Sequence, residues 1–279
     1  MKFTAWKTYL KVEREFRKSL YYLTSLFEKI SKETKGNLNA YQEAMDKFQN
    51  SIQYKNYINS IIKKMVTPLA VENQKTWREA AKRANRSSYI YKLLMEELNN
   101  GLEQVINSQI SQNANLIKTL PNDVANKVTR DISKLTFSGL IASEIEKIIK
   151  DKTNQHSKAS ARLIARTEVA KTQSALTQAR AENLGLDWYV WRTALDGDRV
   201  RKSHRNMEGV LVNWNNPPSP EELVGEKYVG NYHAGNIWNC RCYSEPLLEL
   251  KDVKWPHKVY YNNKIINMTQ EQFVKYNNL

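Results

Sequence analysis

Apolar residues recur at spacings of three to six positions along the first 150 residues, with charged residues between them. This spacing is typical of amphipathic helices. The first apolar stripe consists of Leu10, Phe16, Leu20, Leu23, Phe27 and Ile30. A break at Gly36-Asn37 precedes a second stripe, and we expect Pro68 to interrupt the helix after it, because proline lacks a backbone donor. Further helices are predicted over residues 77–98, 101–120 and 121–135.

The helical pattern continues past residue 150 and then gives way to strands. The polar stretch 151–157 is predicted to be a loop or hinge, and the stretch 159–184 a long helix that ends at Gly185. Beyond it, aromatic and β-branched residues are dense, which favours strands. We expect short strands over residues 188–193, 209–212 and 238–244, with a short polar helix or turn around 199–206. Asn262-Asn263 are predicted to form the turn of a hairpin near the C-terminus.

These elements predict an α+β fold that is predominantly α. It consists of an elongated N-terminal helical bundle or arm, a long helix, and a small C-terminal α+β module with short strands. The predicted divisions are a helical region over 1–150, the module over 159–247, and a tail or hairpin over 248–279.

The charge of the chain is basic and unevenly distributed. The net charge is +14, and the first 150 residues hold 25 basic and 15 acidic side chains, against 18 and 14 in the remainder. A basic balance favours polyanionic partners such as double-stranded DNA, without sequence specificity. The candidates for phosphate contacts are Lys63, Lys64, Lys82, Arg83 and Arg86. The alternative is a solvated helix face that serves solubility.

Neither a membrane span nor a secretory signal is evident. No stretch approaches the roughly 20 consecutive apolar residues that a span requires, and residues 1–10 lack the apolar core of a signal peptide. We therefore expect no membrane partner and a reducing cytoplasm as the first environment of the chain. In that environment Cys240 and Cys242, the two cysteines, are expected to be thiols or metal ligands.

Four short segments occur in a fixed order in the second half of the chain. They are Ile164-Ala165-Arg166-Thr167-Glu168, Trp191-Arg192-Thr193, Asp198-Arg199-Val200-Arg201-Lys202-Ser203-His204 with Gly209 after it, and Asn239-Cys240-Arg241-Cys242. Together they resemble the phage head morphogenesis family, the Mu F-like minor head proteins of tailed phages. The resemblance covers residues 159–244, and residues 114–150 are similar only in their helical pattern.

The resemblance implies a structural protein of the virion, present in few copies, that binds the portal protein and supports head assembly and DNA packaging or ejection. The implied location is inside the head near the portal vertex, after assembly in the host cytoplasm. The other implied partners are capsid or scaffolding proteins and, in some members, double-stranded DNA. No catalytic residue is implied. The signature residues, which we expect to brace the module, are Arg166, Glu168, Trp191, Asp198, Arg201, His204, Gly209, Asn239 and Arg241.

Arg166 and Glu168 lie two positions apart on the long predicted helix. Their side chains therefore point about 200° apart and cannot pair with each other. We expect each to find a partner elsewhere and to lock this helix to the module. The candidate partners are Asp196, Asp198 and Arg201. The alternative is a catalytic arginine and glutamate.

A metal site is the second interpretation of the signature segments. The module contains His204, His233, Cys240 and Cys242, and two imidazoles with two thiolates can close a tetrahedral zinc site. Cysteines at i and i+2 of a strand face the same side. A structural zinc is therefore the one cofactor that the sequence suggests. The alternative is that the cysteines are small buried residues, while Asn239 and Arg241 hydrogen-bond the turns around them.

This chain departs from the family pattern at the predicted metal ligands. Members that carry Cys-x-x-Cys after Asp-x-Arg-Val align their second cysteine with His204 and their first with Arg201, which cannot bind a metal. The usual His-Pro before Asn-Cys-Arg-Cys is Ile237-Trp238 here.

The sequence leaves two other functions open. One is a zinc- or cysteine-dependent nuclease or transferase delivered with the phage genome, in which Cys240 or Cys242 would act with His204 and Asp198. The other is a free nucleic-acid-binding protein, whose affinity would fall steeply with salt.

Overall fold

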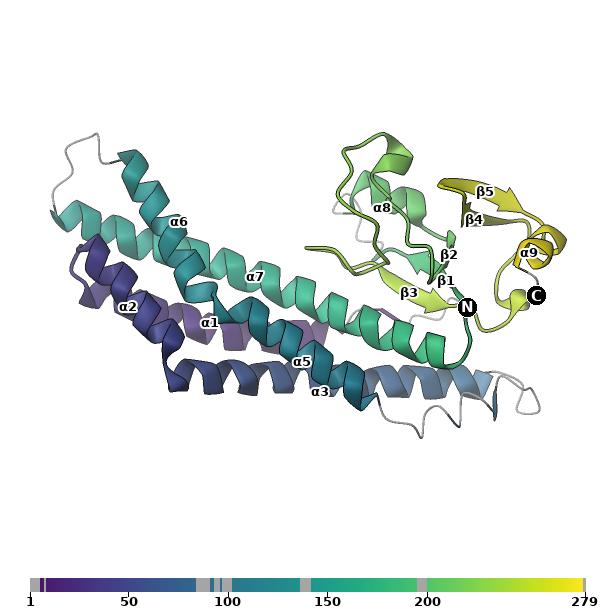
Figure 1. Ribbon diagram of the computed structural model, residues 1–279, viewed down its shortest axis with the longest axis horizontal. Helices are drawn as coiled ribbons and strands as arrows, with labels where there is room; N and C mark the ends of the chain where they lie inside the picture. Colours follow the sequence, from purple (N-terminus) through teal and green to yellow (C-terminus); the bar gives the residue numbers. More distant parts are fainter. Residues whose placement is uncertain are drawn as a thin grey trace. The chain divides into compact units, whose positions relative to one another are not determined.

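A computed structural model of the chain describes residues 6–7, 9–83, 91–92, 96, 102–135, 142–194 and 200–277 (Figure 1). The chain forms two compact units, each assembled from segments that are distant in the sequence. The helical unit consists of residues 10–68 and 106–168. The mixed unit consists of residues 1–9, 69–105 and 169–279. The fold is α+β and mainly α, as the sequence predicts.

The helices carry the apolar stripes that the sequence shows. They are α1 (Leu10–Glu33), α2 (Leu38–Asn50), α3 (Ile52–Arg83), α5 (Glu103–Lys118), α6 (Leu120–Leu135) and α7 (Ala142–Asn183). In the helical unit, Leu20, Leu23 and Phe27 of α1 are fully buried, because their spacing of three to four places them on one face. Asn37 begins α2 by accepting a hydrogen bond from the backbone N–H of Ala40 at 3.0 Å, which satisfies a donor that the first turn leaves free.

Pro68 does not interrupt its helix, contrary to the sequence-based expectation. It lies inside α3, which is continuous from Ile52 to Arg83. Met65, Val66 and Leu69 on the flanking turns are at most 1% exposed. Burial of these side chains offsets the hydrogen bond that proline removes, since tertiary packing commonly overrides local helix propensity.

The predicted hinge over residues 151–157 is also wrong, because α7 runs through it without a break. Two small polar residues of this stretch, Thr153 and Ser157, are fully buried. The Thr153 hydroxyl hydrogen-bonds the hydroxyl of Tyr41 on α2 at 2.8 Å. These residues therefore belong to the core of the helical unit, and their polarity is satisfied there instead of by solvent.

The mixed unit contains a five-stranded sheet with the order β3-β1-β2-β4-β5. The strands are β1 (Trp188–Arg192), β2 (Leu211–Asn213), β3 (Tyr243–Pro246), β4 (His257–Tyr261) and β5 (Lys264–Met268). β1 pairs antiparallel with both β2 and β3, and β2 pairs parallel with β4. The shorter elements are α8 (Lys202–Met207), η3 (Glu222–Val224), η4 (Leu250–Asp252) and α9 (Gln270–Asn277).

Both faces of the sheet are covered, which explains why β1 shows no alternation of apolar and polar residues. Tyr189 and Trp191 belong to one core cluster of the mixed unit, together with Trp77 of α3. Trp188 and Val190 point to the other face and belong to a second cluster, with Phe273 of α9.

The C-terminal hairpin is confirmed, and it is part of this sheet. β4 and β5, drawn in yellow in Figure 1, pair antiparallel around Asn262 and Asn263. These two residues have φ angles of 48° and 60°, the left-handed values that a tight hairpin turn requires. Val259 of β4 is in register with Leu211 of β2, so residues 248–279 complete the same sheet as the predicted module.

The strand expected over residues 238–244 begins later than predicted. β3 starts at Tyr243, and Cys240 and Cys242 lie in the loop before it. Of the helix expected over 77–98, residues 77–83 belong to α3, and most of the remainder lies outside the described residues. None of the described helices combines the length and the apolar character that a bilayer crossing requires.

Candidate functional site

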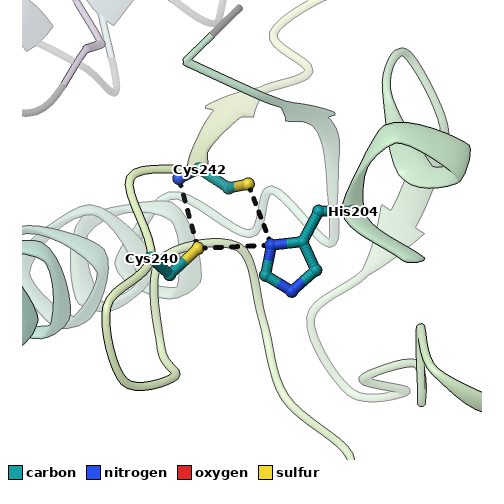
Figure 2. A group of neighbouring side chains, drawn as sticks. All are labelled: His204, Cys240 and Cys242. Atoms are coloured by element: carbon teal, nitrogen blue, oxygen red, sulfur yellow. Dashed lines mark hydrogen bonds between the residues drawn. The ribbon is translucent and has the colours of Figure 1, made fainter. Parts of the chain in front are cut away.

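Three of the four predicted metal ligands converge in the mixed unit. His204 comes from α8, and Cys240 and Cys242 come from the loop before β3 (Figure 2). The Nδ1 atom of His204 lies 3.5 Å from Sγ of Cys240 and 3.4 Å from Sγ of Cys242. The three ligand atoms all lie within 4.8 Å of one another. The side chains are 3–4% exposed, and both cysteines are free.

The backbone around the cysteines depends on two unusual residues. Asn239 has a φ of 57°, in the left-handed region that asparagine tolerates better than most residues. Gly235 has a φ of 85°, and a Cβ atom there would lie 2.8 Å from the carbonyl oxygen of Cys242. Only glycine fits that close approach. Together these residues turn the loop so that the Cys242 N–H donates to the Cys240 sulfur at 3.3 Å.

A hydrogen-bond chain on the far side of the imidazole holds His204 in place. Its Nε2 lies 3.0 Å from the hydroxyl of Tyr232, and that hydroxyl lies 2.7 and 2.8 Å from the two carboxylate oxygens of Glu221. Ser203 also donates to Glu221, at 3.3 Å. All four residues are buried. Burial, reinforced by the neighbouring carboxylate, raises the pKa of Tyr232, so this hydroxyl keeps its proton and donates it to Glu221.

The two thiols differ in acidity. The pKa of Cys240 is lowered, because the Cys242 thiol donates a hydrogen bond to it and His204 lies beside it. The pKa of Cys242 is raised, because it gives that hydrogen bond and is buried. A thiolate beside an imidazole nitrogen can bind a soft metal ion or act as a nucleophile.

His233 is not part of this cluster. Its Nδ1 lies 3.2 Å from the hydroxyl of Tyr189, and its ring also hydrogen-bonds the backbone of Trp214. Burial lowers the pKa of His233 to about 4. The two imidazoles of the mixed unit that the metal prediction grouped together therefore have different surroundings, and the structure assembles the other three residues without His233.

The Trp-Arg-Thr segment braces the turn that follows α8. Trp191 is fully buried, and its ring meets the His204 ring edge-on with centroids 5.7 Å apart. The backbone N–H and the hydroxyl of Thr193 both donate to Glu208, at 2.6 and 2.7 Å. Gly209, with a φ of 76°, donates its N–H to the Trp191 carbonyl at 2.9 Å. This signature segment therefore fixes the element that carries His204.

The remaining signature residues have varied positions. Arg201 donates to the carbonyl of Trp238 at 2.9 Å and lies over its indole ring. Arg166 is half-buried and Glu168 is buried, both on α7, and Arg241 is half-buried beside the cysteines. Asp198, with the other candidate partner Asp196, lies outside the described residues.

Four of the five predicted phosphate-contact residues lie on α3. Lys63, Lys64, Lys82 and Arg83 are exposed, as both a phosphate contact and an ordinary solvated face require. Arg86 lies outside the described residues.

Sequence reasoning missed Tyr232, Glu221 and Ser203. Glu221 follows a proline-rich loop and Tyr232 precedes a histidine, but no spacing rule relates either residue to His204, 17 and 28 positions away. The adjacency of Ser203 to His204 was the one available signal.

Comparison with known proteins identifies the segment that contains this cluster. Residues 122–245 match the model of the family described as "Phage Mu protein F like protein". A protein of Haemophilus influenzae (strain ATCC 51907 / DSM 11121 / KW20 / Rd), described as an uncharacterized protein, is 28% identical over 171 residues. That alignment covers 61% of this chain, and the chain spans only 34% of the length of the relative. No solved structure matches. The family match over residues 122–245 confirms the resemblance that the ordered motifs indicate, to the Phage Mu protein F like family.

Proposed function

We propose that the chain is a minor head protein of a tailed bacteriophage, a structural component present in few copies that binds the portal protein and supports head assembly. The observation that carries this proposal is the family match over residues 122–245. It is supported by the use of Trp191, Thr193 and Gly209, which belong to the four ordered segments, for internal bracing. Residues used in this way favour a structural over a catalytic role. Capsid or scaffolding proteins and double-stranded DNA are further proposed partners.

The helical unit is the part that we propose to dock on the portal or capsid. It presents apolar side chains to solvent on α1 and α3, where Leu10 is 52% and Ile52 is 72% exposed. A deletion of residues 1–150 is a poor test of this division, because it would also remove Trp6, Trp77 and Ala80 from the core of the mixed unit. Surface substitutions avoid that damage.

The test is copurification of the tagged full chain with the portal protein of the same phage from cells assembling heads. We expect the wild type to copurify and the variant with Leu10→Ser and Ile52→Ser to do so less. The matched control replaces Tyr228 and Val229, which are 55% and 41% exposed in the mixed unit, with serine and should copurify normally. A wild-type chain that never associates with portal or capsid proteins would contradict the proposal.

The enzymatic alternative has one specific observation in its favour, the lowered pKa of the Cys240 thiol beside His204. A nuclease or transferase would turn over a nucleic acid or an acyl or nucleotide substrate, and His204→Ala would abolish that turnover. Turnover by the purified wild-type chain, lost in His204→Ala, would favour this alternative over the structural role.

A further inference from the structure

The two sulfur–nitrogen distances in the cluster are those of ligands that share one tetrahedral metal ion. For zinc bound to sulfur at about 2.3 Å and to nitrogen at about 2.0–2.1 Å, tetrahedral geometry places the sulfur and nitrogen atoms about 3.5 Å apart. The two sulfur–nitrogen distances here are 3.5 and 3.4 Å. The side chains therefore already stand at the spacing that a bound ion would impose.

The hydrogen-bond chain leaves the right atom of His204 available. The Tyr232 hydroxyl has a single proton, which it donates to Glu221, so its oxygen accepts the proton of His204 Nε2. Nδ1 is then unprotonated, and its lone pair faces the two sulfur atoms. Because the Cys242 thiol donates its proton to Cys240, the 3.4 Å contact between Cys242 Sγ and Nδ1 has no proton to share. An ion at the point of convergence satisfies all three atoms.

We propose that His204 Nδ1, Cys240 Sγ and Cys242 Sγ hold a zinc ion, and that Tyr232 and Glu221 are positioning residues that fix the tautomer and orientation of the His204 ring. Two thiolates and an imidazole form a soft donor set, which favours zinc over magnesium or calcium. Three protein ligands leave one position of a tetrahedral ion for a small ligand such as water. Binding converts both thiols to thiolates, and their protons leave to solvent.

The role of this ion is to hold α8 to the loop before β3. His204 and Cys240 are 36 positions apart, and the chain between them includes β2, η3 and a glycine-punctuated loop with little regular structure. A crosslink across such a segment restricts the unfolded chain and supports the folded one.

The first measurement is the metal content of the full chain, purified without chelators from cells grown with added zinc. We expect about one zinc per chain. Replacement of zinc by Co²⁺ should give the d–d bands of a tetrahedral ion and a thiolate-to-cobalt charge-transfer band. Metal-free protein that fails to bind added Zn²⁺ or Co²⁺, with both thiols reduced and titratable, would overturn the proposal. A Cys240–Cys242 disulfide in protein purified under reducing conditions would overturn it as well.

The second measurement keeps all three ligands, because replacing a buried ligand can itself unfold the unit. Tyr232→Phe removes only the hydroxyl that orients His204, and we expect zinc affinity to fall about 10- to 100-fold, the usual effect of losing such a partner. Tyr189→Phe is the matched control, since it removes the hydroxyl from the other buried tyrosine–histidine pair, with His233. Its zinc affinity should equal that of the wild type. Equal affinities in Tyr232→Phe and Tyr189→Phe would contradict the positioning role.

Discussion

At the scale of residues, two buried histidines of the mixed unit illustrate how surroundings decide a role. His204 and His233 each contact a tyrosine hydroxyl, at 3.0 and 3.2 Å. The Tyr232 hydroxyl, which contacts His204, donates its proton to the Glu221 carboxylate. Its oxygen therefore accepts a hydrogen bond from the His204 ring. Among the described residues, no such carboxylate lies behind the tyrosine hydroxyl that contacts His233, and the His233 ring also hydrogen-bonds the Trp214 backbone. Burial lowers the pKa of His233 and keeps its ring neutral.

The neutral state of His233 predicts a loss of stability in mild acid. Burial lowers its pKa from 6.5 to about 4, so between these values the unfolded chain binds a proton that the folded chain does not. Stability is therefore full above pH 6.5 and falls as the pH drops toward 4, by up to about 3 kcal/mol. Urea unfolding at a series of pH values measures this change.

The direct check on this residue is an NMR titration of the four histidines, with His233→Gln used to assign the signal. We expect a midpoint near 4 for His233 and a flatter dependence of stability on pH in the variant. A midpoint near 6.5 would show that the ring is accessible to protons in the folded state.

At the scale of elements, the sequence predicts helices that have a regular apolar face, but it fails where polar residues lie in the middle of a helix. Periodic apolar stripes located α1 and α2, and aromatic density located β1, because those signals report burial of a face. Residues 151–157 were predicted to be a loop or hinge because they are polar. Thr153 and Ser157 are nevertheless buried, and the burial of Thr153 depends on a contact with Tyr41, which is distant in the sequence. The assembly of His204 with Tyr232 and Glu221 also depends on tertiary contacts that spacing does not encode.

The Tyr41–Thr153 pair gives a test of how α7 is held in the helical unit. Thr153→Val keeps the shape but leaves the buried Tyr41 hydroxyl without its partner at 2.8 Å, which should cost about 1–3 kcal/mol of unfolding free energy. Adding Tyr41→Phe should recover part of that loss, because both polar groups are then gone. Chemical denaturation of the two single variants and the double variant measures the coupling. Strictly additive losses would mean that the hydroxyls do not interact.

At the scale of the whole molecule, the family segment is not a complete folding unit. Residues 122–245 contain β1, β2, all of β3 except Pro246, and the three proposed zinc ligands. They lack Trp6, Trp77 and Ala81, which belong to the core cluster on one face of the sheet. They also lack Val259 and Phe273, which belong to the cluster on the other face.

Because core residues on both faces of the sheet lie outside this segment, we predict that residues 122–245 alone will not form a stable domain. The isolated segment exposes both faces of a three-stranded remnant of the sheet, and its unfolding should be non-cooperative or undetectable by calorimetry. The full chain should show a cooperative transition under the same conditions. A cooperative transition in the isolated segment at a similar temperature would show that the outer segments are dispensable.

The number of copies of this chain in phage heads, and its position there, test the central claim most directly. Heads and assembly intermediates would be purified from cells producing the phage that encodes this chain, and its copies per portal ring counted by quantitative mass spectrometry. The proposal predicts a small, reproducible number of copies that fractionates with the portal vertex. Absence of the chain from particles at every assembly stage would contradict it.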